Sequence, residues 1–335
     1  MSSHVNRALC ACAVVAVSVL VAACGQTAGG GDSAGTYPQA RLSIMAPADP
    51  GGGWDETARA LQQSIREAKL GKGAEVYNVP GAGGTLGLSQ LVSKQRGKDD
   101  QLMVMGLVML GAVETNQASV GLDQVTPIAG LTQEDEVIVV PADSDYTTLG
   151  DLAAGLKKDP ASVSWAGGSA GGTDQLLVGQ LAKAVGTDPA KTKYVAHDGG
   201  GEALTALLSG SVDAGVSGVS EFADQVQAGK LRALAVSGDK ALDVGGKTVK
   251  PIKDQGIDVV MTNWRGIVAP PGLSDKQHKD VVAFVEKLRA TPAWQANMER
   301  FGWAPLDKSG DAFDTFLQSE QQRVQQLASE LGLAG

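Results

Sequence analysis

The chain has 335 residues and a formal net charge of −9 at pH 7. This acidic balance argues against a nucleic-acid partner, which would need a basic surface. The length is sufficient for one large domain or for two lobes with cores of their own.

The first 24 residues predict an export signal rather than a part of the fold. Arg7 precedes an apolar run at residues 8–23, and the run ends in Val-Ala-Ala before Cys24. A charged start, a short apolar segment and small residues before a break are typical of a secretory signal, and the run is shorter than the roughly 20 residues that a bilayer span needs. The Val-Ala-Ala-Cys pattern is that of a bacterial lipobox. We therefore expect a lipoprotein signal peptide at residues 1–23 and a lipid on Cys24 that anchors the protein outside the bacterial cell membrane.

The three cysteines are Cys10, Cys12 and Cys24. Two of them leave with the signal and the third carries lipid, so the mature domain is predicted to hold no disulfide and no thiolate metal site. Residues 24–37 are rich in Gly, Ser and Ala, which is typical of a flexible tether.

Two glycine-rich turns follow, and each opens a predicted helix. The first, Pro-Gly-Gly-Gly at residues 50–53, comes after a strand-like run at 41–45. The second, Gly-Ala-Gly-Gly-Thr at residues 81–85, comes after a strand-like run at 75–79. Glycine lets backbone N–H groups turn toward a ligand, and a helix start leaves its first N–H groups unpaired at a positive dipole end. Two such turns predict an anion site without basic side chains, although a single such loop is equally consistent with glycines that only shape a turn.

The rest of the chain alternates predicted strands and helices, which favours an α/β fold. β-branched and apolar runs at 136–140 and 264–269 read as two strands that cross between lobes. A middle lobe inserted into a lobe built from both ends is the plan of hinged binding proteins, whose ligand lies in the cleft between lobes. We expect lobe 1 at 38–138 plus 266–335 and lobe 2 at 139–265, each a sheet flanked by helices.

A third glycine-rich turn, Gly-Gly-Ser-Ala-Gly-Gly-Thr at residues 167–173, lies in the middle lobe between a strand and a helix. Ser169 and Thr173 can donate hydroxyls, and the helix start can present N–H groups. Turns of this kind that face one another could bind a carboxylate from both sides of a cleft.

Five segments in order resemble the Bug family, the extracytoplasmic substrate-binding proteins of tripartite tricarboxylate transporters. They are the first turn with its Asp and Ala-Arg at 50–59, Asn-Val-Pro-Gly-Ala-Gly-Gly at 78–84, and the segments 194–204, 208–213 and 264–272. The resemblance implies a monomeric two-lobe solute-binding protein that captures a small di- or tricarboxylate such as citrate and delivers it to two membrane subunits, without covalent chemistry or a cofactor.

The resemblance also extends the predicted site beyond the turns. Asp55 would act through an ordered water or a ligand donor, since a bare carboxylate repels an anion. Asp174 stands near where the family often has a histidine, and Ala196 and His197 replace its Pro and Tyr, which leaves the ligand open. The predicted ligand-binding residues are Pro50, Gly51, Gly52, Gly53, Asp55, Gly83, Gly84, Thr85, Gly168, Ser169, Ala170, Gly171, Thr173, Asp174 and His197.

A secreted serine hydrolase is the alternative. Residues 167–171 fit Gly-x-Ser-x-Gly around Ser169, and Asp258 and His278 follow in the order of a triad. However, His278 lies in a charged helix start, and no His-Gly-Gly motif precedes Ser169, so we expect a protein that is not an enzyme.

Nucleotide and metal sites have little support. The glycine spacing at 81–87 departs from Gly-x-Gly-x-x-Gly, and the mature chain has only two histidines, far apart in sequence. Arg59 is expected to form an i,i+4 ion pair with Asp55 rather than a ligand contact, and Trp54 and Trp264 are either cleft-lining residues or packing anchors.

Overall fold

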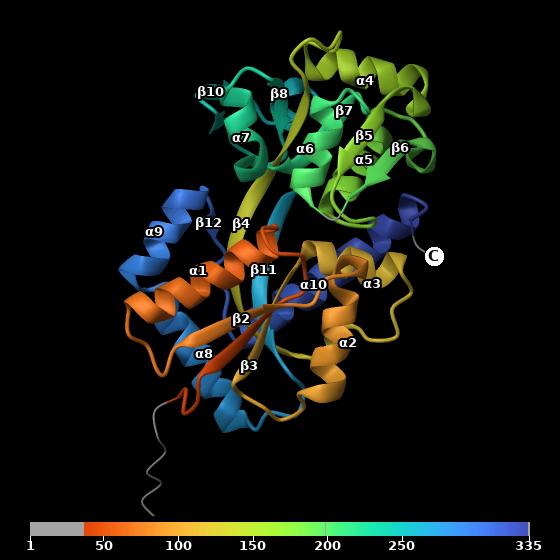
Figure 1. Ribbon diagram of the computed structural model, residues 1–335. Helices are drawn as coiled ribbons and strands as arrows, with labels where there is room; N and C mark the ends of the chain where they lie inside the picture. Colours follow the sequence, from red (N-terminus) through yellow and green to blue (C-terminus); the bar gives the residue numbers. More distant parts are fainter. Residues whose placement is uncertain (1–36, 198, 334–335) are drawn as a thin grey trace, which may run out of the picture. The chain divides into compact units, whose positions relative to one another are not determined.

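The computed structural model describes residues 37–197 and 199–333 (Figure 1). The predicted signal peptide, the lipidation site Cys24 and the tether up to residue 36 lie outside the described residues. Residues 36–335 belong to one compact unit, and the account below concerns this unit.

A single hydrogen-bonded sheet path runs through the unit in the order β2-β1-β3-β11-β4-β7-β5-β6, with β8 and β12 also paired to β4. The parallel pairs β2-β1-β3 and β7-β5-β6 stand at opposite ends of this path, and both are built from strands that alternate with helices. The strands are β1 Leu42–Ala46, β2 Ala74–Asn78, β3 Gln101–Gly106, β4 Thr126–Pro141, β5 Ser164–Gly167, β6 Lys193–Ala196, β7 Ala214–Gly218, β8 Leu231–Val236, β11 Thr262–Ala269 and β12 Ala304–Pro305.

The long strand β4 belongs to both halves of the sheet. Its first part pairs antiparallel with β11, from Thr126 opposite Ala269 to Asp135 opposite Thr262. From Glu136 onward it pairs instead with β7 and β8. In Figure 1, β4 and β11 run side by side between two groups of helices. The predicted two-lobe α/β fold is confirmed, whereas the boundaries at 138/139 and 265/266 stay a prediction.

Ten helices cover the sheet in the described part of the chain. Local sequence explains several of their starts: Thr148 and Ser274 each form a capping box, and Thr291 caps the helix whose first residue is Pro292. The helices are α1 Gly53–Glu67, α2 Thr85–Lys94, α3 Leu107–Thr115, α4 Leu149–Lys158, α5 Thr173–Ala184, α6 Gly200–Leu208, α7 Val219–Gln227, α8 Asp275–Arg289, α9 Pro292–Phe301 and α10 Asp311–Glu330.

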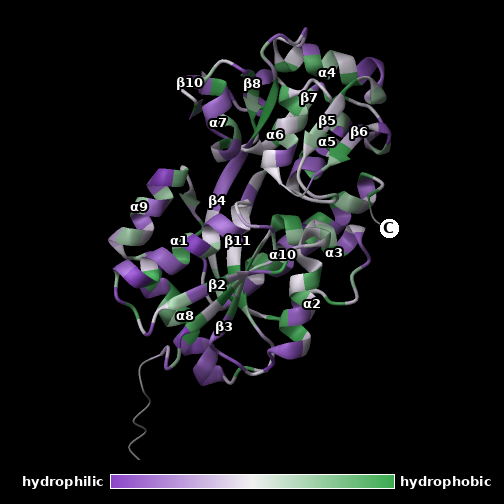
Figure 2. Ribbon diagram, in the orientation of Figure 1, coloured by the Kyte–Doolittle hydropathy of each residue, from purple (hydrophilic) through white to green (hydrophobic). Residues whose placement is uncertain are grey.

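The core lies between the sheet and the helices. Figure 2 shows hydrophobic residues concentrated on the strands and hydrophilic residues on the outer sides of the helices. In β4 the run from Val137 to Val140 is fully buried, as expected for a strand covered on both faces. Trp264 of β11 is buried and packs edge-on against Phe313 and Phe316 of α10, which anchors the C-terminal helix to the crossing strand.

Two elements differ from the sequence expectation. The apolar segment after β3 was not predicted to be helical, but it forms helix α3, which is apolar on most sides and buried at Leu107, Met109, Leu110 and Ala112. A helix that is hydrophobic all round shows no 3.6-residue alternation, so its pattern resembles a strand or turn. A hairpin of β9 (Leu242–Val244) and β10 (Lys247–Val249) was not predicted. Among the described residues, no helix is both long and apolar enough to cross a bilayer.

Candidate functional site

The three glycine-rich turns line one cavity. Gly52 and Gly53 contribute from the start of α1, Gly83 and Gly84 from the turn before α2, and residues 168–169 from the end of β5. The first two turns come together because they follow the carboxyl ends of the neighbouring parallel strands β1 and β2, which share one edge of a sheet, whereas the third turn follows β5 and reaches the cavity from the other half of the sheet path.

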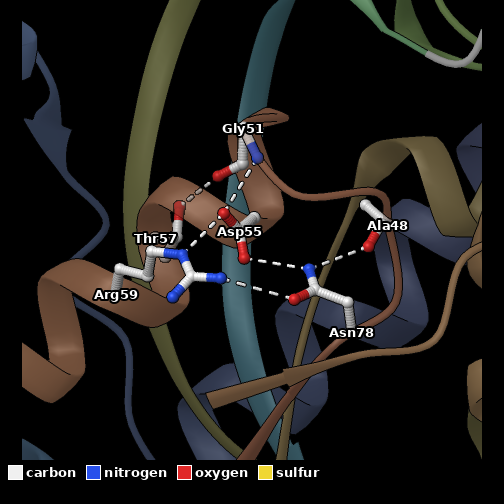
Figure 3. Close-up of polar contacts among 7 residues, drawn as sticks. Ala48, Gly51, Asp55, Thr57, Arg59 and Asn78 are labelled. Carbon is white, nitrogen blue, oxygen red and sulfur yellow. Dashed lines mark hydrogen bonds and ion pairs between the residues drawn. The ribbon is translucent and has the colours of Figure 1, made fainter.

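The first turn is held by Asp55, one turn into α1 (Figure 3). Its Oδ2 accepts hydrogen bonds from the Gly51 N–H at 2.9 Å and from Arg59 Nε at 2.7 Å, and its Oδ1 accepts one from Asn78 Nδ2 at 2.9 Å. Burial raises the pKa of Asp55, but the hydrogen bonds from Arg59, Gly51 and Asn78 outweigh it, so the pKa lies below its usual value. The predicted ion pair of Asp55 and Arg59 is confirmed, and Asp55 fastens the first turn to the end of β2.

The second turn depends on glycine. Gly81, Gly83 and Gly84 have φ values of 122°, 60° and 87°, which L side chains rarely adopt. A Cβ on Gly84 would also lie 2.6 Å from the Trp54 ring. The backbone of this turn therefore packs directly on Trp54, which lines the cavity beside it.

The third turn is held by hydrogen bonds to side chains of α5, the helix that it opens, and by one from Tyr194 of β6. Asp174 Oδ2 accepts from the Gly168 N–H at 2.6 Å, and Gln175 Oε1 accepts from the Gly171 N–H at 2.7 Å. The Tyr194 hydroxyl donates to the Gly168 carbonyl at 2.8 Å. These contacts orient the turn at the start of α5.

The third turn also touches α3 directly. A Cβ on Gly111 of α3 would lie 1.8 Å from the Gly171 carbonyl oxygen, so the two backbones are in close contact there. Because residue 111 comes before the crossing strand β4 and residue 171 after it, this contact joins the two parts of the predicted hinge.

The structure brings about half of the predicted site residues onto this cavity. Those that line it are Gly52, Gly53, Gly83, Gly84, Gly168, Ser169 and Asp174. A neighbouring cavity is lined by Gly83 and Ser169 together with Ala170 and His197. The predicted residues that line neither cavity are Pro50, Gly51, Asp55, Thr85, Gly171 and Thr173.

Apart from Asp174, the charged wall of this cavity was not predicted. Arg265 of β11 lines the cavity, is 5% exposed and forms a buried ion pair with Glu134 of β4. Glu221 of α7 lines it too and accepts a hydrogen bond from Ser217. The sequence did contain one signal, because Arg265 is a charged residue in the otherwise apolar strand predicted at 264–269. Charged side chains are almost never fully buried unless they are paired, so Arg265 pointed to a charged partner or a functional role.

The acids of this wall resist ionisation. Burial raises the pKa of Asp174 to about 7, with further contributions from the charges of Glu221 and Glu134, while the Gly168 N–H acts in the opposite direction. Burial also raises the pKa of Glu221. Burial of Arg265 favours its neutral form, but the carboxylates of Glu134 and Glu221 more than compensate, so its pKa lies above the usual value and it stays charged.

The alternative triad has no support in the geometry. The His278 ring nitrogen Nε2 lies 2.9 Å from the Pro127 carbonyl oxygen, and Asp258 is exposed. Among residues 37–197 and 199–333, no group of three or more His, Cys, Asp or Glu side chains is placed to hold a metal ion.

Comparisons with known proteins agree with this architecture. Residues 57–333 match the model of the tripartite tricarboxylate transporter family receptor. The chain belongs to this receptor family. The predicted family is therefore confirmed, and it is a family of solute-binding receptors rather than of enzymes.

Relatives of this receptor extend over nearly its whole length. It is 25% identical to protein BugT of Bordetella pertussis over 313 residues, which covers 90% of this chain and 92% of BugT. Its fold is similar to that of MatC from Rhodopseudomonas palustris, solved with bound malate (TM-score 0.76, 20% identity, 87% of this chain and 99% of MatC). It is also similar to Rpa4515 of R. palustris, solved with adipate (TM-score 0.75, 18% identity, 89% and 99%).

Proposed function

We propose that this receptor captures a small di- or tricarboxylate, of the kind of citrate, between its two lobes and delivers it to two integral-membrane subunits of a tripartite tricarboxylate-type transporter. It does so as a monomer outside the cell membrane, anchored through a lipid on Cys24. The observation that carries the proposal is the convergence of three glycine-rich turns on one cavity. MatC and Rpa4515, with malate and adipate, have the same fold and support a carboxylate as the ligand.

The turns provide what a carboxylate needs. Gly52 and Gly172 are the N-caps of α1 and α5, and neither helix has a side-chain cap. The first N–H groups of each helix are thus left for a ligand and carry the positive end of the helix dipole. In a protein of net charge −9, such local dipoles rather than overall charge hold an anion.

Nine of the fifteen predicted residues have a part in this proposal. The backbones of Gly52 and Gly53 and the hydroxyl of Ser169 bind one carboxylate, Gly168 holds the third turn through its hydrogen bond to Asp174, and Gly83 and Gly84 shape the rest of the cavity. Asp55, Gly51 and Thr85 hold the turns in place. Closure of the lobes buries the ligand and forms the docking face for the membrane subunits, and no covalent chemistry or cofactor takes part.

The test is calorimetry on the chain from residue 36 onward, which is one compact unit, after refolding to remove carried-over ligand. Citrate, malate, succinate, adipate and neutral sugars would be titrated. We expect saturable binding of at least one acid, no binding of the sugars and no turnover. Ser169→Ala is expected to weaken that binding by about 1 kcal/mol or more. Silence for every acid, or hydrolysis of an added ester, would contradict the proposal.

A further inference from the structure

Helix α10 connects the two lobes, in addition to the crossing strands β4 and β11. Its start is fixed to the crossing strands: the Gly310 N–H donates to the Ile128 carbonyl of β4 at 2.9 Å, and Phe313 packs on Trp264 of β11. With 20 residues the helix is about 30 Å long. Its far end reaches helix α5, which lies between β4 and β11 in sequence (Figure 1).

The contact between α10 and α5 is mainly apolar. Leu331, the residue that follows α10, is 1% exposed and covers Gly179 of α5. A Cβ on Gly179 would lie 2.7 Å from Leu331 Cδ1, 3.1 Å from Cδ2 and 3.3 Å from Cγ. Beside it, Lys183 Nζ donates to Glu330 Oε2 at 2.5 Å. The buried leucine holds this contact more than the exposed ion pair does, because exposed ion pairs contribute little to stability.

A glycine in α5 makes room for the leucine. Gly179 lies in the interior of α5, where glycine destabilises a helix relative to alanine. A glycine at such a position usually has a packing reason, and here the missing side chain leaves the space that Leu331 fills.

A second glycine fixes the direction of the leucine. Gly332, with a φ of 67°, ends α10 in a left-handed cap. The Leu333 N–H donates to the Ala328 carbonyl at 2.8 Å, and the Gly332 N–H donates to the Ser329 carbonyl at 3.1 Å. This pair of hydrogen bonds is the Schellman motif, which holds the backbone on both sides of Leu331.

The contact lies where it restrains the hinge. Gly179 belongs to the part of the chain between the crossing strands, whereas α10 follows β11. The middle of α10 is also tied to β11, because the Trp264 Nε1–H donates to Glu320 Oε2 at 2.7 Å. Rotation of one lobe about β4 and β11 would therefore separate Leu331 from Gly179.

We propose that residues 330–333 form a releasable latch, which holds the two lobes in the arrangement described here and detaches from α5 when they open. The close contact between Gly111 and Gly171 belongs to the same arrangement. The latch acts on the arrangement of the lobes and not on the chemistry of the cavity, so its role does not depend on which acid binds.

The test measures the distance between the lobes without a ligand. The chain from residue 36 onward has no cysteine, so Glu67→Cys on α1 and Lys157→Cys on α4 provide two exposed sites for nitroxide labels. Double electron–electron resonance then reports the distribution of distances between the labels. We expect one main distance in the parent chain. Leu331→Ala, which removes the contact, and Gly179→Val, which fills its space, should each at least triple the share of molecules at other distances.

Leu88→Ala is the matched control. Leu88 of α2 is as buried as Leu331 but comes before β4, so this variant loses the same side chain within one lobe and should keep the distribution of the parent. Gly179→Val keeps every leucine in place and carries the test if Leu331→Ala does not fold. Unchanged distances in the latch variants, or equal broadening in Leu88→Ala, would overturn the inference. Neither result bears on the binding of a carboxylate, which calorimetry tests separately.

Discussion

Gly53→Ala tests the contact between the first turn and Arg265. Gly53 is the first residue of α1, and a Cβ there would lie 2.4 Å from Arg265 Nη2, 3.0 Å from Cζ and 3.3 Å from Nε. Arg265 cannot easily move away, since it is 5% exposed, pairs with Glu134 and lies 5.6 Å from the centre of the Trp303 ring. One added methyl group therefore displaces either the turn or the guanidinium.

The expected cost follows from overpacking. Forcing a methyl group into a filled site costs about 1–3 kcal/mol, and complete loss of a buried ion pair costs about 3–5 kcal/mol. We expect Gly53→Ala to lower the free energy of unfolding by about 1–3 kcal/mol, measured by urea denaturation, and to weaken carboxylate binding at least tenfold, measured by calorimetry. The binding loss arises because the N–H groups of the first turn shift.

Gly52→Ala is the matched control. Gly52 lies on the same cavity wall, but its φ is −80° and a Cβ there meets only the Asp49 carbonyl oxygen at 3.6 Å, an ordinary contact. This variant is expected to keep the stability of the parent chain. If Gly53→Ala is as stable as Gly52→Ala and binds as the parent does, the reasoning about the Gly53–Arg265 contact is refuted.

Three further predictions concern the hinge and its buried acids. Gly111→Ala places a methyl group 1.8 Å from the Gly171 carbonyl oxygen. We therefore expect this variant to disfavour the closed arrangement of the two lobes and to weaken ligand binding at least tenfold. Unchanged affinity in calorimetry would contradict this prediction. Glu136 is fully buried, neither carboxyl oxygen has a partner among the described residues, and burial raises its pKa well above the usual value. We expect its carboxyl group to stay protonated in the folded state, so Glu136→Gln should change the urea-derived free energy of unfolding by less than about 1 kcal/mol, whereas stabilisation of several kcal/mol would indicate an ionised carboxylate. The pKa of Asp174 is raised from 3.8 to about 7. Between these two values the folded state retains a proton that the unfolded state has lost. The free energy of unfolding should therefore fall between pH 4 and pH 7 by up to about 4 kcal/mol. Urea denaturation at pH 5 and pH 7.5 should show a smaller fall in Asp174→Asn than in the parent, and equal falls would remove Asp174 as the cause.

Much of the glycine side of the cavity could be predicted from the sequence. The turns at 50–53, 81–85 and 167–173 are local signals, because glycines between a strand-like run and a helical pattern mark the point where the chain turns from strand to helix. The crossing role of β4 followed from its β-branched run, although the strand begins ten residues earlier, at Thr126.

Except for Asp174, which the family resemblance suggested, the charged side of the cavity could not be predicted in the same way. Arg265, Glu221 and Asp174 come from β11, α7 and α5, and only the packing of these elements brings them together. Asp55, in contrast, was predicted to contact the ligand but does not line the cavity. It faces Asn78 at the end of β2 and holds the first turn. A linear pattern does not show which face of a short helix start points to the cavity.

A crystal structure of the chain from residue 36 onward, grown with the acid that binds most tightly, would test the central claim most directly. The account predicts one ligand carboxylate in the cavity within about 2.7–3.2 Å of backbone N–H groups from both the first turn, at residues 51–53, and the third turn, at residues 168–173. A ligand bound elsewhere, or held in the cavity by neither turn, would contradict it.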